Sequence, residues 1–361
     1  GVWIMAYTTI DDPSAHFHTQ LYTGNGASSH SITNDANAGD FKPDWLWVKN
    51  RSSSGGTGPN IVFDTTRGNT KDLHVNNDEA EHTNSNVLLS FDTDGFSVGT
   101  SGVVNNNTDN FVAWQWKANG GTTSSNNDGS YTSTVQANTT AGFSIVKYGD
   151  ASSFSASTPA TVGHGLGKAP KWVIIKNLDG TRDWGVHHAG LTDAQKIIYL
   201  NLTNAEANSS GFMNSTAPSS TVFTVNTLNV ANGNNLEYIA YCFAEIQGYS
   251  KFGSYAGNNS ADGPFVYTGF TPAWVMIKRT DGGTNNWPIW DYERGVYNGA
   301  RAELYANLSN AEATDSAIDI LSNGFKLRNA STEWNNGTNY IYMAFAKHPF
   351  VSSKGVPTTA V

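Results

Sequence analysis

The chain has 361 residues and a formal net charge of −9, and 14% of its residues are charged while 12% are aromatic. Proteins hold nucleic acid and anionic membranes through basic surfaces, so this acidic balance, with no run rich in Lys or Arg, predicts neither partner. No apolar run reaches the roughly 18 residues of a membrane span, so membrane insertion is not expected either.

The sequence begins with a segment that we predict to be an N-terminal arm, residues 1–15. Its first four residues are too few for the apolar core of a signal peptide, so the sequence does not support secretion by the general route. Met5 is a candidate for the original start, and residues 1–4 would then be an upstream extension.

One stretch of apolar residues occurs three times and defines the organisation of the chain. It reads PDWLWVK at residues 43–49, PKWVIIK at 170–176 and PAWVMIK at 272–278. Each proline lies 53 residues before an aromatic residue in a short apolar run and 68 residues before the start of a closing run. The aromatic residues are Phe96, Phe223 and Phe325, and the closing runs begin at Phe111, Tyr238 and Tyr340. Fixed distances between matching landmarks indicate repeated structural units.

We predict an all-β protein built of three tandem β-sandwich (jelly-roll-like) units. The units cover residues 16–117, 141–246 and 247–348, and a C-terminal tail covers 349–361. The polar run 118–140 is predicted to be a linker, because it supplies the extra length between the first two repeats. Units two and three lack such a spacer, so we expect them to pack as a rigid pair with unit one attached more loosely.

The repeated strand is apolar on both faces, which predicts that both faces are covered. Trp45 and Trp47 alternate with Leu46 and Val48, whereas a sandwich of two sheets covers only one face of each sheet. A neighbouring unit or another copy of the chain is therefore expected to cover the second face.

Short helices are predicted over residues 202–209 and 308–316. Thr203 or Ser309 would be the N-cap, and Glu206 or Glu312 three residues later would complete a capping box (as Asn76 and Glu79 would in unit one). Residues 77–80 (NDEA) match this block in unit one. We interpret the block as structural.

The motif Asp-x-x-Arg-Gly occurs at residues 64–68 and 291–295. An acid and a guanidinium three residues apart most often form a local ion pair that holds a turn. Unit two has His187 and His188 instead, so a shared catalytic use is not expected.

No metal site and no cofactor are predicted. His16 and His18 alternate on one strand and His187 adjoins His188, but neither pair has a third ligand at a suitable spacing, so we interpret them as surface or turn residues. Residues 92–95 (DTDG) resemble the opening of a calcium loop but lack its remaining ligands, so a turn is expected.

No catalytic residues are predicted, and we expect a protein that is not an enzyme. Glycoside hydrolysis needs two carboxylates at a set separation, and the candidates carry no pairing signature: Glu245, Asp262, Asp291, Glu293 and Glu303. The sequence also contains no nucleophile elbow and no phosphate-binding glycine loop. Cys242, the single cysteine, excludes an intrachain disulfide and is interpreted as a small buried apolar residue.

Four tryptophans are the candidate carbohydrate-binding residues: Trp184, Trp287, Trp290 and Trp334. They lie in polar, loop-like sequence, where an exposed indole stacks on a sugar ring and Asn or Asp binds hydroxyls. The alternative is that they cap the core of each unit or fill a subunit interface.

A set of phrases spread along nearly the whole chain carries a resemblance to a known family. The phrases include TTIDDP at 8–13, YTGNG at 22–26, AGFSIVKY at 141–148, TVGHGLG at 161–167, DGPFVYTGF at 262–270, SNGFKL at 322–327 and YIYMAFA at 340–346. Together they resemble the tandem-repeat, β-rich virion structural (tail fibre-like) proteins of tailed bacteriophages, especially marine phages.

The resemblance implies a non-enzymatic virion structural protein, a fibre or surface appendage that is made in the host cytoplasm and resides on the particle surface. The implied partners are other copies of the chain in a homotrimer, which the doubly covered strands suit, and other virion proteins, with host-surface glycans as a candidate ligand. The alternatives are a capsid decoration protein that stabilises the shell and a polysaccharide depolymerase. The family brings no established catalytic residues.

Overall fold

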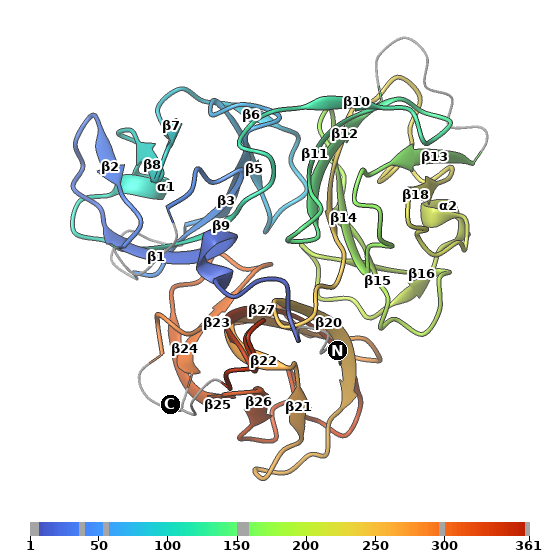
Figure 1. Ribbon diagram of the computed structural model, residues 1–361. Helices are drawn as coiled ribbons and strands as arrows, with labels where there is room; N and C mark the ends of the chain where they lie inside the picture. The colour runs from blue at the N-terminus through green and yellow to red at the C-terminus, as the bar shows by residue number, and fades with distance from the viewer. Residues whose placement is uncertain (1–6, 36–39, 53–57, 150–158, 296–299, 358–361) are drawn as a thin grey trace.

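The computed structural model describes residues 7–35, 40–52, 58–149, 159–295 and 300–357, and these are almost wholly strands and loops (Figure 1). The predicted all-β class is confirmed. The helices within the described residues are short: η1 (Pro13–Ala15), α1 (Gly102–Asn105) and α2 (Ser210–Met213). None of them has the length and hydrophobicity of a membrane-spanning helix.

Unit 1 is a six-stranded antiparallel sheet with a three-stranded sheet packed against it. The large sheet contains, in order, β1 (Phe17–Thr23), β9 (Asn110–Trp116), β3 (Trp45–Asn50), β4 (Asn60–Asp64), β5 (Lys71–His74) and β6 (His82–Thr83). The small sheet contains β2 (His30–Ile32), β8 (Gly95–Val98) and β7 (Leu88–Asp92). Phe96 of the small sheet shares a core with Leu46 and Val48 of the large one.

Unit 2 has an eight-stranded sheet and a two-stranded one. The large sheet contains, in order, β10 (Ser124–Asn126), β11 (Ser133–Asn138), β12 (Phe143–Tyr148), β19 (Tyr238–Phe243), β14 (Trp172–Asn177), β15 (Gly185–His188), β16 (Lys196–Tyr199) and β17 (Ala207–Asn208). The small sheet pairs β13 (Ala160–Gly163) with β18 (Val222–Val225).

Unit 3 is one continuous eight-stranded sheet. It contains, in order, β20 (Ser250–Ala256), β27 (Asn339–Pro349), β22 (Phe270–Arg279), β23 (Pro288–Asp291), β24 (Ala300–Tyr305), β25 (Ala313–Leu321), β26 (Gly324–Leu327) and β21 (Phe265–Tyr267).

The same strand order recurs in the three units, which the spacing of the landmarks indicated. In each, an opening strand lies beside the closing strand, which pairs with the repeated tryptophan strand and then with the hairpin that follows it. The first tryptophan of each repeat faces the last aromatic residue of its closing strand: Trp45 and Trp116, Trp172 and Phe243, Trp274 and Phe345. The strand pairing therefore repeats, whereas the jelly-roll-like description of each unit stays a prediction.

The run 118–140 is not a linker, because it supplies the two outermost strands of the unit 2 sheet. β11 pairs with β12 along its whole length, and β10 pairs with β11. The buried Gln136 also donates from Nε2 to the hydroxyls of Thr65 and Thr66 in unit 1, at 2.9 and 2.7 Å. The polar composition suggested a linker, but strands at the edge of a sheet are also rich in polar residues because one of their faces meets water.

The three large sheets face one another around a common centre, as the three lobes of Figure 1 show. One cluster of buried residues combines the inward faces of all three, including Trp47, Ile174 and Met276. At its middle lie Trp116, Phe243 and Phe345, whose ring centroids are 5.5 to 6.5 Å apart. The second face of each repeated strand is thus covered by the other two units of the same chain.

The outward faces of the repeated strands form three further cores, one in each unit. Leu46 lies in the outer core of unit 1, Val173 in that of unit 2 and Val275 in that of unit 3. Coverage of both faces is therefore confirmed. The prediction that unit 1 is loosely attached is wrong, because its tryptophans share the central core with units 2 and 3.

The arm and the tail both pack against unit 3. Ile10 is buried in the central core, and Tyr7 donates from its hydroxyl to Gly269 O at 2.8 Å. Ser353 N donates to Asp11 Oδ1 at 2.6 Å, which joins the tail to the arm. The candidate start at residues 1–5 lies outside the described residues.

Candidate functional site: the joints between the units

The four tryptophans predicted to bind carbohydrate are buried, so none presents an indole face to solvent. Trp184, Trp287 and Trp290 are 0% exposed and Trp334 is 3% exposed. Trp290 and Trp334 pack edge to face in the outer core of unit 3, with ring centroids 5.3 Å apart. Trp184 and Trp287 lie at the joints, by which we mean the contacts where one unit packs against the next. The four indoles therefore fill cores and interfaces between units.

At each joint, a side-chain N–H of one unit donates to a strand carbonyl of its neighbour. The three bonds are Trp184 Nε1 to His74 O (3.0 Å), Trp287 Nε1 to Tyr199 O (3.0 Å) and Asn60 Nδ2 to Tyr305 O (2.9 Å). The N–H group of each of these two buried indoles thus has its hydrogen-bond acceptor in the neighbouring unit. The acceptors occupy equivalent places in units 1, 2 and 3.

The lysine that ends each repeated motif also bonds to the neighbouring unit. Each ammonium group donates to a carbonyl of its own unit and to one across the joint. The bonds across the joints are Lys49 Nζ to Ser309 O (2.7 Å), Lys176 Nζ to Asp78 O (3.1 Å) and Lys278 Nζ to Thr203 O (3.0 Å). Unit 1 therefore reaches unit 3, unit 2 reaches unit 1 and unit 3 reaches unit 2, which closes a ring.

Burial lowers the pKa of the three lysines, to about 7 for Lys49 and about 8 for Lys176 and Lys278. An ammonium group loses hydration when it is buried, and the carbonyl oxygens replace only part of it. The joints therefore hold their charged groups at a cost in free energy that depends on pH.

The segments that receive the lysines are those predicted to be short helices, and each is instead a loop that leads into a strand, β17 in unit 2 and β25 in unit 3. No helix forms over 202–209 or 308–316, because backbone groups there bond to the neighbouring unit rather than to one another. These bonds are Glu81 N to Leu178 O (2.9 Å), Glu206 N to Thr280 O (2.9 Å) and Glu312 N to Arg51 O (3.0 Å). The counterpart of Glu206 in unit 1 is therefore Glu81, two residues beyond Glu79, which was predicted to occupy that place.

The two Asp-x-x-Arg-Gly motifs form the predicted local ion pairs. Arg67 Nε lies 2.5 Å from Asp64 Oδ2, and Arg294 Nε lies 2.5 Å from Asp291 Oδ2, with all four side chains buried. Each carboxylate also accepts a bond from another unit: Tyr241 OH to Asp64 (2.7 Å) and Trp114 Nε1 to Asp291 (2.9 Å). These pairs hold the joints as well as the turns.

Unit 2 places a histidine where the other units place the acid. His188 occupies the register position of Asp64, and its Nε2 donates to Tyr342 O of unit 3 at 3.2 Å while its Nδ1 accepts from Gly190 N at 2.9 Å. Burial lowers the pKa of His188 to about 3 and that of His187 to about 4, so both are neutral. The prediction that these histidines are surface or turn residues is wrong, because both are buried and His188 bonds to unit 3.

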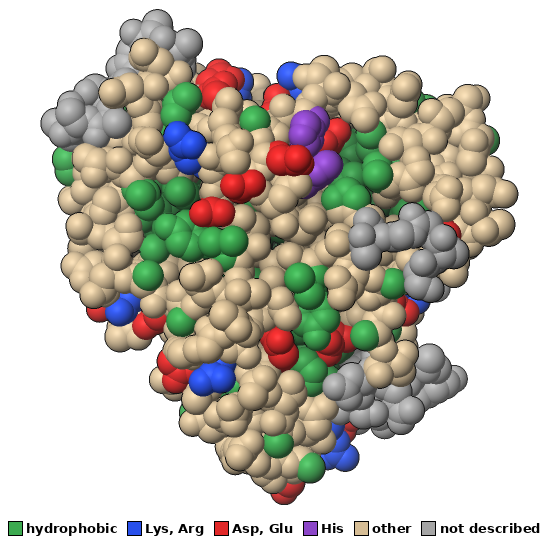
Figure 2. Space-filling view, turned by 180° about the vertical axis from the view of Figure 1, so that it is seen from behind, with side chains coloured by type: hydrophobic (Ala, Val, Ile, Leu, Met, Phe, Trp, Pro, Cys, Tyr) green, Lys and Arg blue, Asp and Glu red, His purple; other side chains and the backbone are tan. Residues whose placement is uncertain are grey.

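A further cluster of histidines and carboxylates, which the sequence did not single out, lies where β5 and β6 approach unit 2. The ligand atoms of Asp72, His74 and His82 are within 4.8 Å of one another. Histidine side chains gather with acidic ones over this part of the surface in Figure 2. The signal in the sequence is Asp-x-His followed eight residues later by His, and these are the residues that could hold a metal ion.

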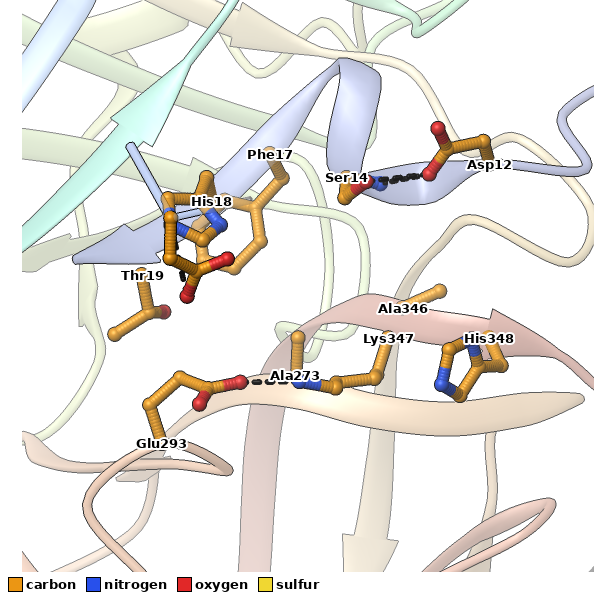
Figure 3. Close-up of a pocket in the computed structure, with 11 residues that line it drawn as sticks. Asp12, Ser14, Phe17, His18, Thr19, Ala273, Glu293, Ala346, Lys347 and His348 are labelled. Atoms are coloured by element: carbon orange, nitrogen blue, oxygen red, sulfur yellow. Dashed lines mark hydrogen bonds and ion pairs between the residues drawn. The ribbon is translucent and has the colours of Figure 1, made fainter. Parts of the chain in front are cut away.

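A cleft of about 490 Å³ lies between unit 1 and the β22–β27 side of unit 3 (Figure 3). Two contacts between titratable side chains lie in it: Lys347 pairs with Glu293, and His18 Nε2 lies 3.9 Å from Asp35 Oδ2. His18 is only 8% exposed, so its predicted surface position is wrong as well.

The fold and the joints define a class: a single-chain all-β protein in which three units of one strand order close into a ring. The chain belongs to the family described as Domain of unknown function (DUF7483), whose model matches residues 12–349. That range runs from the arm to the end of β27, so one family description spans all three units. No curated protein and no solved structure matches the chain.

Proposed function

We propose that this chain is a non-enzymatic structural protein of a bacteriophage virion, acting as a fibre or surface appendage. The observation that carries the proposal is the closed ring of joints, in which buried charged groups bond between units. Asp64, Asp291 and the three lysines are engaged in this way. Groups held so firmly serve architecture, and the resemblance to virion proteins supports the same conclusion.

The partners in this proposal are other virion proteins. A homotrimer was expected because the repeated strands needed cover on a second face, and the other two units of the same chain now provide that cover. One chain therefore takes the place that three chains would occupy. Mass photometry of the purified protein should give the mass of a single chain, and a trimer mass would support the homotrimer instead.

Immuno-electron microscopy of purified virions, with antibodies raised against this chain, tests the proposal. Label on an appendage supports it, and label spread over the capsid favours the alternative, a decoration protein that stabilises the shell. Virions without label, in a preparation where a known capsid protein is labelled, would contradict both. Release of new reducing ends from host polysaccharide would favour the depolymerase.

Adhesion to host-surface glycans stays a candidate second function, with different residues. Phe265 is 44% exposed and Tyr267 is 51% exposed, and they lie on the same face of the edge strand β21. Exposed aromatic rings at such a spacing stack on sugar rings. A glycan array probed with the wild-type chain and with a Phe265→Ala, Tyr267→Ala double variant would test this. Only the wild type should bind.

A further inference from the structure

The cluster of Asp72, His74 and His82 has the composition and spacing of a zinc site. A tetrahedral zinc ion with ligand bonds of about 2.0–2.1 Å places neighbouring ligand atoms about 3.4 Å apart. Asp72 Oδ1 lies 3.2 Å from His82 Nδ1 and 3.6 Å from His74 Nε2. We propose that these three side chains bind one Zn²⁺ ion, with water completing its coordination.

Glu79 lies where an outer partner of the two rings is needed. Its Oε2 is 3.3 Å from His74 Nδ1 and 3.7 Å from His82 Nε2, the ring nitrogens that face away from Asp72. A histidine that binds a metal normally donates its other N–H to a carboxylate, which fixes its tautomer and orientation.

The fold of the joint does not require these residue types, because the other two joints are built without them. The positions equivalent to Asp72 and His82 follow from the pairing of the two strands. The position equivalent to His74 is that of the carbonyl that accepts the bond across the joint. The counterparts are Ile197, Tyr199 and Ala207 in unit 2 and Glu303, Tyr305 and Ala313 in unit 3. Two histidines and an aspartate at one of three equivalent places therefore need a separate explanation, and metal binding supplies it.

A metal ion here would brace the segment by which unit 1 docks on unit 2. Between the ligands His74 and His82 lie Asp78, whose carbonyl accepts from Lys176, and Glu81, whose N–H donates to Leu178 O. The side chain of His82 is 40% exposed, so an ion can reach the site from solvent. Zinc should therefore raise the melting temperature of the whole chain, because it binds the folded state.

The test uses the full chain, stripped of metal with a chelator and dialysed, and titrated with ZnCl₂ by calorimetry, with zinc content measured by mass spectrometry. One equivalent of zinc per chain is expected. His74→Tyr and His82→Ala introduce the residues found at the equivalent places of other units, so both variants should fold. Each should weaken zinc binding at least about tenfold, and Glu79→Gln should weaken it about 10–100-fold.

His18→Ala is the matched control, because it removes a histidine that lies beside a single carboxylate, and it should leave zinc binding unchanged. Circular dichroism and urea unfolding check that each variant is folded. The proposal is overturned if the folded wild type binds no zinc, or if the His74→Tyr, His82→Ala double variant binds it as tightly. This outcome is independent of where the protein resides on a virion.

Discussion

Trp116, Phe243 and Phe345 occupy one position in three closing strands and meet at the centre of the molecule. Each ring contacts the other two, with centroids 5.5 to 6.5 Å apart, and each is 0–1% exposed. Aromatic rings at this spacing gain edge-to-face interactions in addition to the burial of their surface. A single side chain at this point therefore stabilises all three units.

Trp116→Ala should lower the free energy of unfolding by about 3–5 kcal/mol, because it leaves a large cavity in the shared core. Urea unfolding followed by circular dichroism measures this. Phe265→Ala, at a side chain that is 44% exposed, is the control and should change the value by less than about 0.5 kcal/mol. Equal effects of the two substitutions would rule out the central role of Trp116.

The stability of the protein should fall as the pH falls from about 6.5 towards 4. In the unfolded chain a histidine has a pKa near 6.5, whereas in the folded chain the pKa is about 3 for His188 and about 4 for His187. The unfolded state therefore takes up protons first in this window, and each histidine contributes up to about 1.4 kcal/mol per pH unit. His188 faces the Tyr342 carbonyl, the Gly190 N–H, His187 and the positive charge of Lys171, which leave no acceptor for a second proton.

Urea midpoints at pH 7 and pH 5 measure this loss. His188→Gln keeps a donor for Tyr342 O but cannot be protonated, so it should lose less stability than the wild type between the two pH values. If the two proteins lose the same amount, His188 does not carry the effect.

At the scale of single residues, the sequence predicted which face of a strand a side chain lies on, but not which residues it contacts. The alternation of Trp45 with Leu46 correctly placed them on opposite covered faces, because the period of a strand is set by its backbone. The burial of Trp184 and Trp287 could not be predicted, because the carbonyls that their N–H groups reach belong to residues about 90 to 110 positions earlier.

The joint is the element that recurs, and its lysines make it sensitive to pH. The pKa of an unfolded lysine is near 10.4, whereas burial lowers it to about 7 for Lys49 and about 8 for Lys176 and Lys278. Between these values the unfolded state binds more protons than the folded one, so stability should rise as the pH rises from about 7 to 9.5. Urea midpoints at pH 7, 8 and 9 measure the rise.

Lys176→Met removes one of these titrating groups and should flatten the rise, whereas Lys168→Met, at an exposed position, should leave it unchanged. Two kinds of buried group oppose the rise because burial raises their pKa: the Cys242 thiol, which ionises near pH 8.5 in the unfolded chain, and the tyrosines, which ionise near pH 10. The three lysines outweigh the single thiol between pH 7 and 9. A wild-type stability that is constant from pH 7 to 9 would contradict the buried state of the lysines.

The errors of prediction at this scale share one physical cause. Residues 118–140 look like a linker, and residues 202–209 look like a capped helix, when only neighbours in sequence are considered. β11 is ordered by its pairing with β12 and by Gln136 contacts with unit 1, and the loop at Glu206 is ordered by Thr280. Tertiary hydrogen bonds decide both segments, and a local pattern does not contain them.

The whole molecule is one cooperative body, because its central core belongs to no single unit. Residues 247–357 expressed alone would expose Trp274, Met276, Met343 and Phe345, which are at most 1% exposed in the full chain. We expect this fragment to show no cooperative unfolding, and the full chain to unfold in a single transition. Tryptophan fluorescence and circular dichroism in urea should then give coincident curves.

A fragment that unfolds cooperatively, or two separate transitions in the full chain, would show that a unit is stable on its own. The repetition of one unit was within reach of the sequence, because matching landmarks keep the same spacing in all three copies. The ring was not, because two explanations for a doubly covered strand, a second copy or a neighbouring unit, predict the same local pattern.

Encoding the ring in a single gene frees its three joints to diverge. In an assembly of identical chains, one substitution alters every interface at once, and a change that suits one setting must be tolerated in all. Two joints carry an acid with an arginine, and the third carries a buried histidine. Among the described residues, the Asp72 cluster occurs at one joint. Each face of the protein can thus acquire its own specialisation without disturbing the other two.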